Sequence, residues 1–69
     1  MPIYLADVHQ NVVIKQITGT DKVRTHLANL GFIVGETVML VNKVDDNVIV
    51  KIKGVSLAIS NELAKRILI

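Results

Sequence analysis

The two histidines, His9 and His26, are the side chains best suited to bind a metal ion. Imidazole nitrogens are common ligands of zinc and iron, but a stable site usually needs three or more ligands. The chain has no cysteine, and nothing in the sequence places Asp7, Asp21 or Glu62 at a ligand spacing from either histidine. We therefore interpret both histidines as solvated surface residues and expect no cofactor. A small metal-binding carrier remains an alternative function.

Catalytic motifs are missing from the sequence. It contains no Gly-x-Ser-x-Gly nucleophile turn, no Gly-x-x-x-x-Gly-Lys phosphate loop and no His-Glu-x-x-His pair. A chain of 69 residues also has little material from which to build a deep substrate pocket. We therefore expect a protein that is not an enzyme.

Lysines on a predicted strand form the one basic pattern. Lys51 and Lys53 alternate on the same face as Ile49, and Lys43 can join them across a hairpin. Such a strip could bind RNA or an acidic protein surface, but RNA-binding barrels usually add aromatic side chains on which bases stack. The chain has only one Tyr and one Phe, and its net charge is +2. An RNA-binding barrel is therefore kept as a second alternative, and nucleic acid is not the expected partner.

The composition indicates a dense aliphatic core with apolar side chains left over. Hydrophobic residues make up 51% of the chain, and no disulfide can supplement the core. Exposed apolar patches tend to mark partner surfaces, so we expect a protein-binding or self-association surface. No apolar run approaches the roughly 20 residues needed to span a bilayer, and the first residues do not resemble a secretory signal. A cytoplasmic location fits these features.

A helix is predicted over residues 21–30. Its apolar face consists of Val23, Leu27 and Leu30, spaced at i, i+4 and i+7. Thr20 or Asp21 can cap its first turn, and Gly31 stands where a helix C-terminus favours positive φ. A second, short helical turn is predicted over residues 61–65, capped by Ser60.

Alternating apolar residues predict five short strands: residues 12–17, 36–42, 48–53, 55–60 and 67–69. An odd-length turn with a bulge is expected between the second and third strands. It would place Leu40 opposite Val50 and Val38 opposite Ile52, which keeps one face apolar. The prediction is a mainly β domain spanning residues 1–69, a small SH3-like, partly open barrel with one inserted helix. An OB-type barrel is the nearest competitor.

The ordered segments resemble the FeoA family over essentially the whole chain. The similar segments are Leu5-Ala6-Asp7-Val8, Ile17-Thr18-Gly19, Leu27 to Gly35, Val50 to Gly54, Leu57-Ala58-Ile59 and Ala64 to Ile67. Two departures stand out. His9-Gln10-Asn11 replaces a loop that commonly holds glycine, where Asn11 could adopt positive φ. Ser60-Asn61 stands where the family often carries Arg or Lys.

The resemblance implies an SH3-like accessory protein of bacterial ferrous iron uptake. Such a protein would lie in the cytoplasm and contact a membrane iron transporter that carries a G-protein domain. The same domain also occurs as an interaction module in iron-dependent repressors. The family is not known for enzymatic activity.

The stretch from Leu30 to Gly35 is the most informative part of the sequence. Leu30 and Gly31 are expected to finish the helix, and Gly35 to start the next strand. The apolar residues between the two glycines cannot all enter one core, so part of this stretch is a candidate docking tip. The candidate partner-binding residues are Phe32, Ile33, Val34, Lys51 and Lys53.

Overall fold

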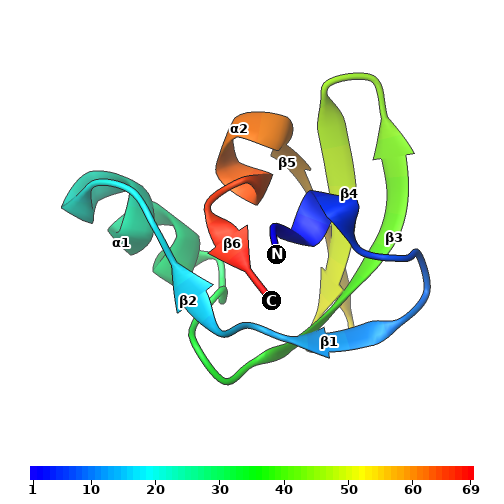
Figure 1. The fold of residues 1–69 in the computed structure, drawn as a ribbon, viewed down its shortest axis with the longest axis horizontal. Helices are drawn as coiled ribbons and strands as arrows, with labels where there is room; N and C mark the ends of the chain where they lie inside the picture. The colour runs from blue at the N-terminus through cyan, green and yellow to red at the C-terminus, as the bar shows by residue number, and fades with distance from the viewer.

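Six strands form two antiparallel sheets in the computed structural model, which describes residues 1–69 (Figure 1). The larger sheet has the order β1-β3-β4-β5, and the smaller one pairs β2 with β6. In chain order the elements are η1 (Ile3–Leu5), β1 (Asn11–Val13), β2 (Gln16–Ile17), α1 (Asp21–Asn29), β3 (Thr37–Val44), β4 (Asn47–Ile52), β5 (Val55–Ser60), α2 (Asn61–Ala64) and β6 (Ile67–Leu68). The sheets do not close on each other, so the predicted mainly β, partly open architecture is confirmed. No helix in this chain combines the length and the apolar character needed to cross a membrane.

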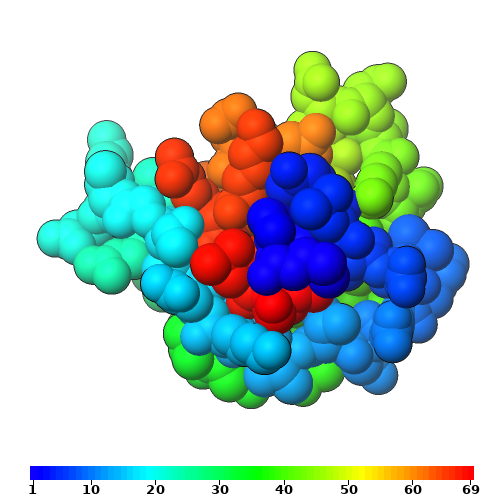
Figure 2. Space-filling view, viewed as in Figure 1, coloured from blue at the N-terminus to red at the C-terminus, as the bar shows by residue number.

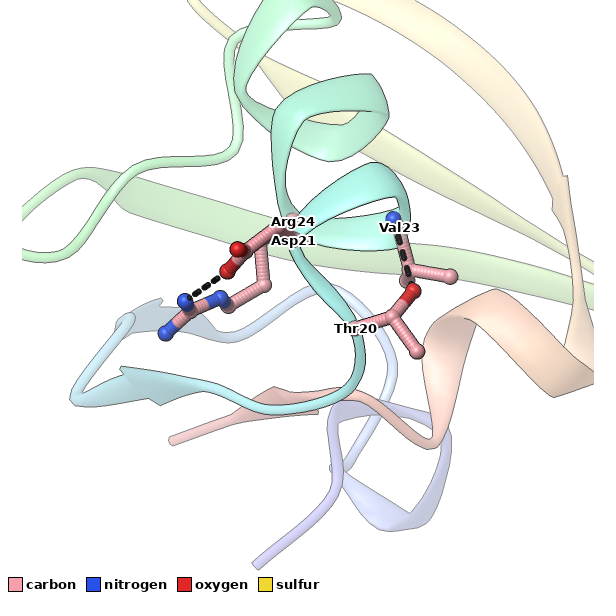
Figure 3. Close-up of polar contacts among 4 residues, drawn as sticks. All are labelled: Thr20, Asp21, Val23 and Arg24. Carbon is pink, nitrogen blue, oxygen red and sulfur yellow. Dashed lines mark hydrogen bonds and ion pairs between the residues drawn. The ribbon is translucent and has the colours of Figure 1, made fainter.

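Helix α1 begins and ends where its capping residues predict. The Thr20 hydroxyl accepts a hydrogen bond from the Val23 N–H, and Asp21 pairs with Arg24 one turn on (Figure 3). At the other end Gly31 adopts a φ of 104°, a conformation that costs an L side chain energy but not glycine. The helix is short, and Leu27 is its only fully buried residue.

The predicted strand over residues 12–17 is wrong as one element, because the chain changes sheets within it. Ile14 donates to the Glu36 carbonyl on the β3 side, while the next residue, Lys15, donates to the Leu68 carbonyl in β6. β1 therefore ends at Val13 and β2 begins at Gln16. This corner turns the chain from one sheet to the other, with the Ile14 side chain buried inside it.

The register of β3 on β4 is as predicted, but the turn differs. Leu40 lies opposite Val50 and Val38 opposite Ile52. The turn itself is a two-residue connection of Asp45 and Asp46. The extra, unpaired residue instead lies in a bulge between Leu40 and Asn42. The bulge shifts the last pairs by one residue, so that Lys43 lies opposite Val48 and Val44 opposite Asn47.

The β4–β5 hairpin and the turn after it follow the local sequence. Lys53 and Gly54 both adopt positive φ between the paired residues Ile52 and Val55, as a two-residue type I′ turn requires. The Ser60 hydroxyl accepts from the Leu63 N–H and caps α2, which confirms the predicted short helical turn.

One apolar core joins the two sheets. It contains no buried polar or charged residue, and no buried side-chain nitrogen or oxygen lacks a hydrogen-bond partner. Phe32 is the only aromatic among its members, which are Ile3, Ala6, Ile14, Leu27, Phe32, Val38, Leu40, Val48, Val50, Ile52, Ile59, Ala64 and Ile67. The expectation of an aliphatic core is confirmed.

Candidate interaction surface

The three apolar residues between Gly31 and Gly35 divide between core and surface. Phe32 is 0% exposed and is among the largest fully buried side chains of the core. As a partner-binding residue it is therefore a wrong prediction. Its N–H donates to the Leu27 carbonyl, which directs the chain back under the helix and turns the ring inward.

Ile33 and Val34 point to solvent, with 46% and 63% of their area exposed. Backbone hydrogen bonds hold this tip in place, because the Glu36 N–H donates to the Ile33 carbonyl and the Gly35 N–H donates to the Ile14 carbonyl. The apolar side chains are thus presented on a tight turn tied to the sheet. Figure 2 shows the green surface of this turn against the blue surface of β1.

The predicted basic strip on one strand face is wrong. Lys51 is exposed on the outer face of β4, opposite Met39. Lys53 is not in the strand but in the β4–β5 turn, and the bulge brings Lys43 opposite Val48. Since successive residues of a strand point to opposite faces, Lys43 does not share the face of Lys51. A linear groove of three lysines for RNA is therefore absent.

Lys53 instead lies at the same end of the sheet as the exposed tip. Val38, near the start of β3, pairs with Ile52, the residue before Lys53. A Cβ on Gly31 would lie 3.6 Å from Cδ1 of the Ile52 side chain. We call Ile33, Val34, Lys53 and Val55 the end surface. It combines three exposed apolar side chains with one cation.

Val55 is the member of the end surface that the sequence did not single out. Its alternation with Ser56 placed it on the inner face of a strand. It is nevertheless 56% exposed, because it directly follows the hairpin turn, beyond the rim of the core. Its position directly after Lys53-Gly54, a possible turn, is the sequence feature that could have indicated this exposure.

The histidines do not come together with acidic residues. His9 lies in the loop before β1 and donates its backbone N–H to Leu40, and His26 lies on the exposed side of α1. No group of three or more His, Cys, Asp or Glu residues could hold a metal ion. The positive φ expected at Asn11 occurs at His9, with φ 63°, another residue type that tolerates this region.

Two hollows indent the remaining surface, and neither is lined by a histidine. The first, of about 340 Å³, is apolar and is lined by Met1, Val12, Val13, Lys15 and Ile69. The second, of about 420 Å³, is polar and is lined by Tyr4, Asp46, Ser60, Asn61, Glu62 and Lys65. Ser60 there caps α2, and Glu62 pairs with Lys65, so the hollow contains no nucleophile activated by a neighbouring base.

Solved structures share this fold over nearly the whole chain. An iron uptake regulatory protein, FeoA, superposes with a TM-score of 0.88 at 24% identity, covering 97% of this chain and 91% of its own. Stenotrophomonas maltophilia FeoA complexed with zinc superposes with a TM-score of 0.83 at 24% identity, covering 99% of this chain and 87% of its own. It is described as an SH3 domain protein, with a suggested role as a ferrous iron transport activating factor.

The same architecture occurs inside a larger protein. A manganese-dependent transcriptional repressor superposes with a TM-score of 0.86 at 10% identity, covering 97% of this chain and 39% of its own. None of the curated proteins compared with this sequence matches it. The family model of the FeoA domain, however, matches residues 1–69. With its inserted helix and two open sheets, this SH3-like chain belongs to the FeoA domain family.

Proposed function

We propose that this protein is a non-enzymatic accessory protein of bacterial ferrous iron uptake. In this proposal it acts in the cytoplasm, by contact with the G-protein part of a membrane ferrous iron transporter. Membership of the FeoA domain family supports the iron-uptake context. The absence of a metal-ligand cluster and of an activated nucleophile favours contact with a protein over chemistry on a small molecule.

The observation that carries the proposal is the exposed pair Ile33 and Val34. Apolar side chains held on a rigid turn can bind without the entropic cost of ordering a loop. Lys53, at the same end of the sheet, adds a positive charge, which suits an acidic rim on the partner. In the proposed complex the end surface docks with its apolar residues at the centre and Lys53 at the edge.

Val34→Asp is expected to weaken binding to the isolated cytoplasmic G-protein domain of the transporter by at least about tenfold, because the interface would bury an unpaired carboxylate. Val44→Asp is the matched control. Val44 is also an exposed valine, at 44%, but it lies at the β3–β4 hairpin, away from the end surface. Isothermal titration calorimetry of both variants and the parent protein with this domain measures the binding.

Two outcomes would count against the proposal. One is that the parent protein shows no binding at tens of micromolar. The other is that Val34→Asp and Val44→Asp weaken binding equally, which would place the contact elsewhere or attribute the loss to added charge. Thermal unfolding of each variant separates a lost contact from a lost fold.

A further inference from the structure

Strand β5 forms one edge of the larger sheet and lacks the features that usually keep an edge strand from pairing with another strand. β5 is last in the order β1-β3-β4-β5, and only β4 pairs with it. Natural edge strands are commonly kept from pairing by charged residues, proline or a bulge. The six residues of β5, Val55-Ser56-Leu57-Ala58-Ile59-Ser60, contain none of these, and their register on β4 is unbroken.

The hydrogen-bonding pattern shows which backbone groups face the open edge. Ile52 and Val55 flank a two-residue turn and therefore form a hydrogen-bonded pair. Further along, the Asn61 N–H donates to Asp46 on the same side. Alternation then directs the backbone groups of Leu57 towards β4 and those of Ser56 and Ala58 away from it. Neither Ser56 nor Ala58 has a backbone hydrogen bond outside the strand ladders, and both residues are exposed.

We propose that β5 pairs with β5 of a second copy of this chain, in antiparallel orientation, with the two-fold axis at Leu57. In this register Ser56 of each copy lies opposite Ala58 of the other, so each such pair exchanges both of its N–H···O bonds. Leu57 then lies opposite Leu57 of the second copy, on the face that is already half-buried. The two sheets become one continuous sheet across the dimer.

Side-chain size and charge favour a second copy as the occupant. Ser56 and Ala58 are small, so the opposed Ser56–Ala58 side-chain pairs do not crowd each other on the sheet face. No charged residue lies within either strand, and therefore no like charges meet. At each end of the paired strands, the β4–β5 turn of one copy, which carries Lys53, lies on the same side as α2 of the other copy, which carries Glu62.

The proposed interface is small, so we expect it to form only a weak dimer. Two six-residue strands bury less area than the roughly 1,200 Å² of stable specific interfaces. We expect self-association that depends on concentration, with a dissociation constant of about 10 µM to 1 mM.

Two double variants that differ only at position 58 test this register. Ser56→Glu with Ala58→Glu places like charges opposite each other in both pairs, and we expect at least a roughly tenfold weaker dimer. Ser56→Glu with Ala58→Lys places opposite charges there, and we expect association at least as strong as in the parent protein. Within one copy these positions lie opposite Lys51 and Ile49 on the exposed outer face, so neither variant should disturb the core.

Sedimentation equilibrium up to about 1 mM measures the association, and amide hydrogen exchange locates it. The amides of Ser56 and Ala58 should be protected in the parent protein and exchange rapidly in the double-glutamate variant, while Leu57 stays protected in both. A parent protein that is monomeric throughout this range would overturn the proposal. So would a double-glutamate variant that dimerises normally, or equal loss of association in both double variants.

Discussion

Phe32→Ala is expected to lower the free energy of unfolding by about 3–5 kcal/mol, the largest effect of any single truncation in this protein. Phe32 is fully buried and is the largest side chain of the core. Removing its ring loses the burial of an aromatic surface and leaves a cavity among aliphatic side chains that can fill it only in part. A domain of this size rarely has more than about 3–5 kcal/mol of stability. A measurable fraction of the Phe32→Ala variant should therefore be unfolded at room temperature.

The adjacent residue supplies the control for Phe32. Ile33→Ala removes an exposed side chain and should change the free energy of unfolding by less than about 0.5 kcal/mol. Urea unfolding followed by far-ultraviolet circular dichroism measures both variants. Similar losses for Phe32→Ala and Ile33→Ala would contradict the division of this stretch into a core residue and a surface residue.

Leu27→Ala is the second large effect, with an expected loss of about 2–5 kcal/mol. Leu27 is the only fully buried residue of α1, so it is the main attachment of the helix to the barrel. Its carbonyl also accepts the hydrogen bond from the Phe32 N–H. Loss of the side chain should loosen both the helix and the turn that carries the end surface.

Val23→Ala is the matched variant on the same helix. Val23 is only partly buried, so its truncation to alanine should lower the free energy of unfolding by about 0.5–1.5 kcal/mol. Hydrogen exchange can separate local from global loosening, because Leu27→Ala should expose the α1 amides to exchange more than those of β4. If Leu27→Ala and Val23→Ala cost the same, α1 is attached to the barrel in another way.

Features set by local sequence could be predicted without the structure. The caps at Thr20 and Ser60 depend on a hydroxyl that reaches an N–H three residues on, and Gly31 depends on its own backbone. The register of Leu40 on Val50 followed from keeping apolar side chains on one face. Each of these depends on neighbouring residues or on a single hairpin.

Features set by pairing with distant strands could not be predicted from the sequence. The run from Val12 to Ile17 contains no glycine or proline to mark a break. Only its hydrogen bonds to Glu36 on one side and Leu68 on the other explain why it changes sheets at Ile14. The bulge after Leu40 likewise has no glycine to mark it. It moved Lys43 off the face of Lys51.

The candidate site was predicted in part for the same reason. The two glycines marked the Phe32–Val34 stretch as a turn, but the side chain that enters the core depends on the Leu27–Phe32 hydrogen bond. Lys53 was predicted in a strand because a Lys-Gly turn is a weaker signal than Asn-Gly or Asp-Gly. The structure corrects both positions and places Lys53 at the same end of the sheet as the tip.

The most direct test of the proposed function is an amide NMR titration of isotope-labelled protein with the unlabelled cytoplasmic G-protein domain of a ferrous iron transporter. We predict saturable shifts that centre on the amides of Ile33, Val34, Lys53 and Val55, with residues at the β3–β4 hairpin unchanged. Absence of any shift at tens of micromolar would contradict the proposed contact. Shifts confined to surfaces other than the end surface would contradict it equally.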